Sequence, residues 1–175
     1  MSEAKWIYGT PFEKPCQCDI DLALYLRSCH RQNVFHFGTG LHHTVGINAH
    51  NLNQGLIVHG VTTCAAEVNR YMELTGENPD LMKTYKVSYC DIYSIHPSEL
   101  PKYDIVSLFH VGEYSLSVDD DCRLIDMMIE ALKPGGLMMF FKDSTGYGKA
   151  SVSYAATKRL KFVRNENSLI LFRRV

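Results

Sequence analysis

Short apolar runs alternate with amphipathic helical segments along almost the whole chain, and this alternation restricts the possible folds more than any other feature. The run at residues 34–37 stops at Gly38-Thr39-Gly40, and a helical pattern follows from about His42 to Asn53. The same order returns further along, with expected strands at residues 56–61, 85–89, 104–110 and 137–141. Strands that alternate with helices in this way favour a parallel sheet with helices on both faces.

Start and stop signals mark the ends of the expected helices. Thr63 and Ser117 are suited to cap two helices, because a hydroxyl can accept hydrogen bonds from free backbone amides. The carboxylates of residues 119–121 oppose the positive helix end after Ser117, so we interpret them as capping residues rather than a cation site. Gly76 and the segment Lys133-Pro134-Gly135-Gly136 predict where these two helices end.

The last part of the chain predicts an antiparallel hairpin after a helix at about residues 149–160. Two apolar runs, at residues 161–164 and 169–172, are joined by the polar turn Asn165-Glu166-Asn167. With the five earlier strands, the hairpin predicts a Rossmann-like, doubly wound α/β sheet of seven strands that is mostly parallel.

A chain of 175 residues with 46% hydrophobic content fits one domain, which we expect to cover residues 1–175. A helix over residues 19–30 is expected to lead into this domain. Residues 1–18 are predicted to be irregular, and they could cover a substrate as a lid. The aromatic side chains suited to such a lid are Trp6, Tyr8 and Phe12.

Charge and composition narrow the classes of partner. The chain has 18 Lys and Arg against 19 Asp and Glu, so its net charge of -1 gives no general attraction to nucleic acid or to an anionic membrane. Basic residues gather in the C-terminal quarter, but without interleaved exposed aromatic side chains they are a weak sign of nucleic-acid binding. We therefore expect a small-molecule partner. The sequence does not indicate which oligomeric state the protein adopts.

The sequence also favours a cytoplasmic location. Its start lacks a secretory pattern, no apolar run reaches membrane-spanning length, and the six cysteines are expected to be reduced thiols. Cys16, Cys18, Cys29 and His30 have the wrong spacing for the usual zinc patterns, and the histidines near the expected strands form no helical pair. We therefore predict no metal site.

Three segments carry a resemblance to a known family. "NVFHFGTGLHH" is similar to the glycine-rich first motif of class I S-adenosylmethionine-dependent methyltransferases, "YCDIYSI" to the acidic turn after the third strand, and "EALKPGGLMMF" to the helix, turn and strand that precede the hairpin. The order of elements over about residues 19–175 also resembles this family. The resemblance implies a methyltransferase fold, S-adenosylmethionine as the cofactor and methyl transfer to a small-molecule acceptor.

The resemblance also implies which residues bind the cofactor, and here the sequence diverges from the family pattern. His36 stands where the family has an acid that helps to hold the amino acid part of the cofactor, and Thr62 stands near the position of the ribose-binding acid. The nearest carboxylate to Thr62 is that of Glu67, one helical turn further on. The expected cofactor-binding residues are His36, Gly38, Thr39, Gly40, Thr62, Asp91 beside the adenine and Ile92 against its ring.

Candidate catalytic residues lie at and just after the end of the fourth expected strand, where the family places groups that face the methyl donor and the acceptor. His110 is suited to act as a general base on a hydroxyl or an amine, and Glu113 could orient it or bind a cationic substrate. Tyr114 completes this group of candidates. The alternative interpretation of His110 is a polar residue that ends a strand without a chemical role.

The divergence leaves two further hypotheses for the function. One is a non-catalytic protein of the methyltransferase fold that serves as a binding or scaffolding subunit. The other is an enzyme that keeps the fold but uses another ligand or reaction, with the histidines as new polar contacts.

Overall fold

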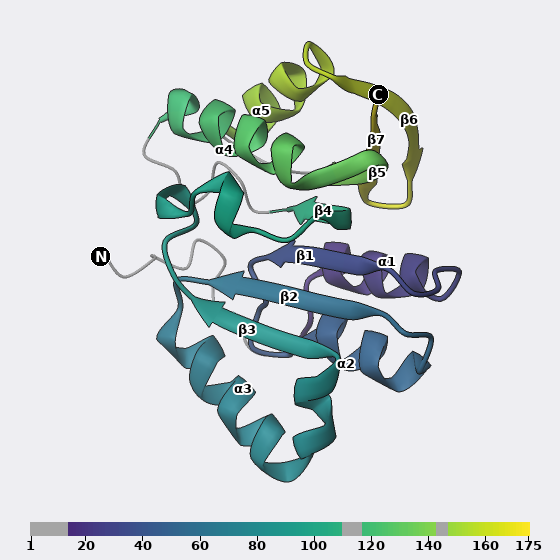
Figure 1. The fold of residues 1–175 in the computed structure, drawn as a ribbon, viewed down its shortest axis with the longest axis vertical. Helices are drawn as coiled ribbons and strands as arrows, with labels where there is room; N and C mark the ends of the chain where they lie inside the picture. Colours follow the sequence, from purple (N-terminus) through teal and green to yellow (C-terminus); the bar gives the residue numbers. More distant parts are fainter. Residues whose placement is uncertain (1–13, 110–116, 143–146) are drawn as a thin grey trace. The chain divides into compact units, whose positions relative to one another are not determined.

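The computed structural model of the protein describes residues 14–109, 117–142 and 147–175 (Figure 1). The chain divides into two units, the first ending at Asp91 and the second beginning at Ile92. The expected single domain over residues 1–175 stays a prediction. Trp6, Tyr8 and Phe12 of the expected lid lie outside the described residues. Within the described part of the chain, no helix is both long and apolar enough to span a membrane.

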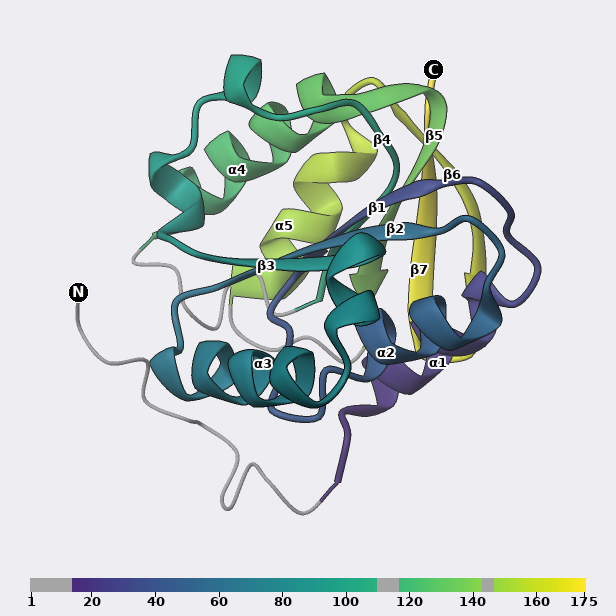
Figure 2. The same ribbon diagram turned by 60° about the horizontal axis from the view of Figure 1, so that its bottom comes forward.

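The first unit is a parallel three-stranded sheet with helices, as the alternating pattern predicts. Its strands lie in the order β3-β2-β1, and β2 pairs in parallel with both neighbours. Figure 2 shows that the three α-helices of this unit lie on the same face of these strands. The elements are α1 (Gln17–Leu26), β1 (Asn33–Phe37), α2 (Thr44–Leu52), β2 (Ile57–Thr62), α3 (Ala65–Glu77), η1 (Pro79–Lys83) and β3 (Tyr85–Tyr89).

The second unit contains the remaining strands in the order β4-β5-β7-β6. Strands β4 and β5 are parallel, whereas β5 pairs with β7 and β7 with β6 in antiparallel fashion, which confirms the C-terminal hairpin. The seven strands of the described residues and their helices confirm the α/β Rossmann-like fold class. The elements are η2 (Ile92–Ser94), η3 (Pro97–Glu99), β4 (Tyr103–Leu108), α4 (Val118–Ala131), β5 (Leu132–Phe141), α5 (Tyr147–Ala156), β6 (Leu160–Glu166) and β7 (Leu169–Arg174).

Some of the predicted element ends are wrong. The residue that precedes α3 as its cap is Cys64 rather than Thr63, and α3 continues through Gly76 to Glu77. The segment Lys133 to Gly136 belongs to β5, where the pairing with β4 shifts register, so the extra residues form an irregularity inside the strand. The cap at Ser117 is confirmed, because its side-chain oxygen accepts a hydrogen bond from the backbone N–H of Asp120.

Polar side chains are buried at one end of the first unit. Val34 and Phe35 of β1 are fully buried, as expected for a strand inside a parallel sheet. The polar side chain of His36 in the same strand is buried as well, with only 1% of its surface exposed. Buried polar groups cost free energy unless they are hydrogen-bonded or paired. The buried polar residues of this unit are Asp19, Asp21, His36, Thr39, His43, Thr62, Glu67 and Thr75, and several of them gather around the turn after β1.

Candidate functional site

The carboxyl ends of β1, β2 and β3 meet at one edge of the first unit. The N–H of Gly38, directly after β1, donates to the carbonyl oxygen of Val61 at 2.9 Å, and the N–H of Cys90, directly after β3, donates to the carbonyl oxygen of Thr62 at 3.1 Å. The turns after the three strands are therefore neighbours. Ligands of open parallel sheets bind beyond this edge, so it is the candidate site.

Gly38, Thr39 and Gly40 form a turn after β1, called the glycine turn below. Gly38 has a φ of 79° and Gly40 a φ of 64°, which lie in the left-handed region that residues with a Cβ rarely adopt. Thr39 between them is 1% exposed, whereas both glycines are half-buried. The two glycines thus present backbone toward the edge of the sheet, as the sequence predicts.

The hydroxyl of Thr39 is held by a buried carboxylate from α3. It donates to Oε2 of Glu67 at 2.7 Å, and Glu67 is itself only 4% exposed. The sequence identifies Glu67 as the carboxylate nearest to Thr62, but the structure turns it toward the glycine turn. Glu67 therefore fixes the position of the turn rather than standing open at the end of β2.

The side chain of His43 completes a buried hydrogen-bonded network beside the glycine turn. Its Nε2 lies 2.8 Å from the carbonyl oxygen of Glu67, so Nε2 carries the proton, and Nδ1 accepts from the hydroxyl of Tyr85 at 2.7 Å. Burial lowers the pKa of His43 to about 4, which keeps the ring neutral at pH 7. His43 precedes α2 with a φ of 48°, a left-handed conformation for which its two hydrogen bonds compensate.

A second buried carboxylate reaches the glycine turn from α1. Oδ1 of Asp19 lies 3.4 Å from Nε2 of His36, and both side chains are almost completely buried. Oδ2 of the same carboxylate would lie 3.6 Å from a Cβ placed on Gly40. A carboxylate from another element thus lies beside position 36, where the family pattern has an acid, and the sequence gives no signal for this contact.

Thr62 and Asp91 differ in how open they are to a ligand. The side-chain oxygen of Thr62 accepts the N–H of Cys64 at 3.0 Å, and the residue is 3% exposed. Asp91 is exposed, one residue after the Cys90 amide that bonds to the end of β2. Ile92, by contrast, is buried, with 1% of its surface exposed. The boundary between the two units falls between these residues, since Asp91 ends the first unit and Ile92 begins the second.

The predicted catalytic residues His110, Glu113 and Tyr114 lie outside the described residues. Among the residues that the structure describes, no group of three or more His, Cys, Asp or Glu side chains is arranged to hold a metal ion. Cys16 and Cys18 lie close together, with their sulfur atoms 3.0 Å apart, but they form no such group.

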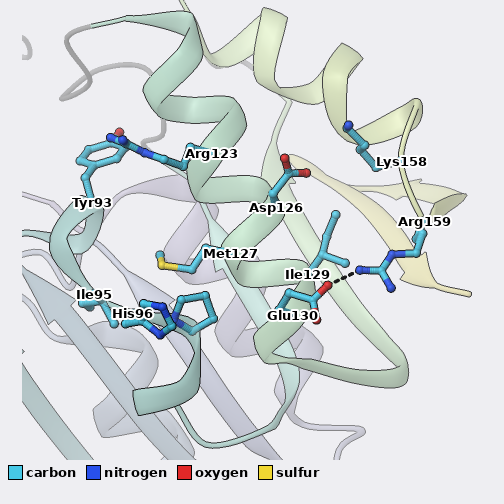
Figure 3. Close-up of a pocket in the computed structure, with 11 residues that line it drawn as sticks. Tyr93, Ile95, His96, Arg123, Asp126, Met127, Ile129, Glu130, Lys158 and Arg159 are labelled. Carbon is cyan, nitrogen blue, oxygen red and sulfur yellow. Dashed lines mark hydrogen bonds and ion pairs between the residues drawn. The ribbon is translucent and has the colours of Figure 1, made fainter.

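The second unit contains a separate cavity of about 520 Å³ along α4 (Figure 3). Its lining includes the apolar side chains of Met127 and Ile129 and charged side chains of both signs. These charges are engaged within the protein, since Arg159 pairs with Glu130, and Asp126 accepts from the hydroxyl of Tyr154 at 2.7 Å. The cavity lies between α4, residues 93–97 and the residues that follow α5, and no residue of the glycine turn lines it.

Comparison with known proteins supports the fold. No protein-family model and no curated protein matches the chain. Among solved structures, the N-methyltransferase NodS from Bradyrhizobium japonicum WM9 in complex with S-adenosyl-L-homocysteine is similar with a TM-score of 0.66 and 16% identity, over 90% of this chain and 84% of NodS.

Two further solved structures share this architecture. The [4+2]-cyclase SpnF has a TM-score of 0.64 at 16% identity, over 83% of this chain and 58% of SpnF. The CcbJ methyltransferase from Streptomyces caelestis has a TM-score of 0.58 at 20% identity, over 72% of this chain and 49% of CcbJ. The chain therefore has the fold of class I S-adenosylmethionine-dependent methyltransferases, as the sequence motifs indicate.

Proposed function

We propose that the protein binds S-adenosylmethionine at the glycine turn and transfers its methyl group to a small-molecule acceptor. The observation that carries this proposal is the pair of left-handed glycines at the carboxyl end of β1, with a buried carboxylate beside Gly40. The fold supports the proposal, because NodS, which has the same architecture, is an N-methyltransferase solved with S-adenosyl-L-homocysteine.

The residues at the turn fit this cofactor in shape and in charge. Among the described atoms, only Oδ2 of Asp19 lies within 4 Å of the Cβ position of Gly40, so the glycine leaves room for a ligand to approach the backbone. Asp19 and Glu67 are both negative when ionised, and S-adenosylmethionine carries a sulfonium and an ammonium group. Buried carboxylates favour such a cation, because charges interact more strongly where water is excluded.

Other residues of the site would orient the nucleoside part of the cofactor. We propose that the exposed carboxylate of Asp91 binds the nucleoside, with Ile92 covering the adenine ring. Thr62, which stands near the position of the family's ribose-binding acid, still has a hydroxyl proton to donate after accepting the N–H of Cys64. A hydroxyl in place of a carboxylate weakens such a contact, since hydrogen bonds to charged groups are about twice as strong as neutral ones.

When bound, the cofactor supplies a methyl group made electrophilic by the sulfonium. The protein must then remove a proton from the acceptor, and we propose His110 as the base, with Glu113 and Tyr114 as the residues that orient it or the acceptor. Histidine suits this role because its ordinary pKa lies near neutrality.

A non-catalytic binding function, or a different reaction on the same fold, is the second candidate. The burial of Thr62 and the engagement of Glu67 with Thr39 leave Asp91 as the exposed carboxylate beside these turns. SpnF, a protein of this architecture, is described as a [4+2]-cyclase, so the fold alone does not decide the reaction.

Calorimetric titration with S-adenosylmethionine and S-adenosylhomocysteine tests the proposal. We expect micromolar binding to the wild type and at least about tenfold weaker binding to Asp91→Asn, because a charge-assisted hydrogen bond is lost. Asp80→Asn is the matched control, since Asp80 is an exposed aspartate of the same unit that pairs with Lys83. Absence of heat at millimolar ligand would exclude the cofactor assignment.

Turnover distinguishes an enzyme from a binding protein. If S-adenosylmethionine binds, release of S-adenosylhomocysteine in the presence of small amines and hydroxyl compounds supports methyl transfer. Tight cofactor binding without release for any acceptor would favour the non-catalytic alternative. Release that His110→Ala leaves unchanged would exclude His110 as the base.

A further inference from the structure

Two buried carboxylates flank the glycine turn, but they are engaged differently. Glu67 is bound to the hydroxyl of Thr39, which lies inside the turn. Asp19 approaches the same turn from α1 and lies next to Gly40, the more C-terminal of the two glycines. Burial, and then the negative charges of Glu67 and Asp19, raise the pKa of the Tyr85 hydroxyl, so both carboxylates act on one small region of the unit.

The two oxygens of the Asp19 carboxylate have different surroundings. Oδ1 lies 3.4 Å from Nε2 of His36 and within 4.0 Å of the thiol of Cys18. Oδ2 points toward Gly40, at 3.6 Å from the position that a Cβ would take there. One oxygen thus lies beside the His36 ring, and the other lies beside the half-buried backbone of Gly40.

We infer that Asp19 is a ligand-binding residue, whose Oδ2 accepts a hydrogen bond from the ammonium group of the amino acid part of the cofactor. This inference rests on the proposed function. It assigns the recognition of a protonated amine to a residue of α1, outside the glycine-rich segment "NVFHFGTGLHH". The residue inside that segment, His36, is then a positioning residue that holds the carboxylate toward Gly40.

The chain offers a matched control on the same helix. Asp21 is also buried, at 5% exposed against 4% for Asp19, and lies two residues further along α1. Its carboxylate accepts a hydrogen bond from the side-chain amide of Gln17 at 2.9 Å. The substitutions Asp19→Asn and Asp21→Asn therefore remove the same charge from the same helix, but only the first removes it from the side of Gly40.

The test compares two ligands that differ only in the amino group. Wild type, Asp19→Asn and Asp21→Asn are titrated with S-adenosylhomocysteine and with its analogue in which hydrogen replaces the α-amino group. We expect the wild type and Asp21→Asn to bind S-adenosylhomocysteine about ten- to a hundredfold more tightly than the analogue, because a charge-assisted hydrogen bond is lost with the amino group. Asp19→Asn should bind both ligands with nearly equal affinity.

Several outcomes would overturn the assignment. If Asp19→Asn keeps the wild-type preference, or weakens both ligands equally, Asp19 does not bind the amino group. If Asp19→Asn fails to fold, the wild type can still refute the assignment, because equal affinity for the two ligands excludes an anionic partner for the amine. A wild type that binds neither ligand refutes the proposed function, whereas one that binds both equally refutes only the role of Asp19.

Discussion

Replacing Gly46 by alanine tests how tightly the Tyr85 ring is packed against α2. A Cβ on Gly46 would lie 2.4 Å from each of three ring carbons of Tyr85, far below an ordinary van der Waals contact. The ring is fully buried, and its other edge faces Gly60, whose Cβ would lie 3.2 Å from a ring carbon. The hydroxyl of Tyr85 also holds His43 at 2.7 Å. The ring therefore has little freedom to move away.

The expected magnitude follows from two opposing effects. Alanine in place of glycine inside a helix stabilises by up to about 1 kcal/mol. Overpacking of a buried site costs about 1 to 3 kcal/mol, and loss of the Tyr85 hydrogen bond adds about 1 kcal/mol. We expect Gly46→Ala to destabilise the protein by about 1 to 3 kcal/mol, because the steric cost exceeds the gain in helix propensity.

Gly76→Ala provides the matched control for this prediction. Gly76 also lies inside a helix, α3, and no described atom outside its chain neighbours and the backbone of its own helix lies within 4 Å of its Cβ position, so only the gain in helix propensity remains. Urea unfolding of both variants should give a gap of about 2 to 4 kcal/mol, or about 5 to 15 °C in melting temperature. A Gly46→Ala variant as stable as Gly76→Ala would refute the packing of Tyr85 described above.

Two further predictions concern buried His43 and the start of α4. Burial lowers the pKa of His43 to about 4, below its ordinary value of 6.5, so its contribution to stability is complete above pH 6.5 and declines as the pH falls toward 4. Between pH 7 and pH 5 the wild type should therefore lose about 2 kcal/mol more unfolding free energy than His43→Gln, and equal losses in urea titrations would contradict this. Ser117→Ala should lower stability by about 1 kcal/mol, because the cap on the N–H of Asp120 is lost, and an unchanged urea midpoint would show that the cap contributes nothing.

Local patterns were sufficient to predict most elements of the fold. The glycines at 38 and 40 adopt the left-handed conformation that their place between a strand and a helix requires. Ser117 caps α4 because its hydroxyl and the following acidic residues act within a single turn. The hairpin likewise depends on neighbouring segments, although β6 extends through Glu166, so that the expected turn begins later.

The contacts that build the candidate site were not predictable in the same way. Thr39 and Glu67 are 28 residues apart, and Asp19 reaches His36 from a different element, so no spacing along the sequence signals either contact. The early start of β5 at Leu132 is also determined by pairing, since Tyr103 of β4 lies opposite it. Between Leu132 and Leu137 the register shifts and Gly135 has a φ of 77°, so the turn propensity of this segment appears as an irregularity inside the strand.

A crystal structure of the protein with S-adenosylhomocysteine tests whether the glycine turn binds the cofactor. We expect the ligand over Gly38 and Gly40, with its nucleoside near Asp91 and its amino group within hydrogen-bonding distance of Asp19. A ligand bound elsewhere on the molecule, or an empty glycine turn at millimolar S-adenosylhomocysteine, would contradict it.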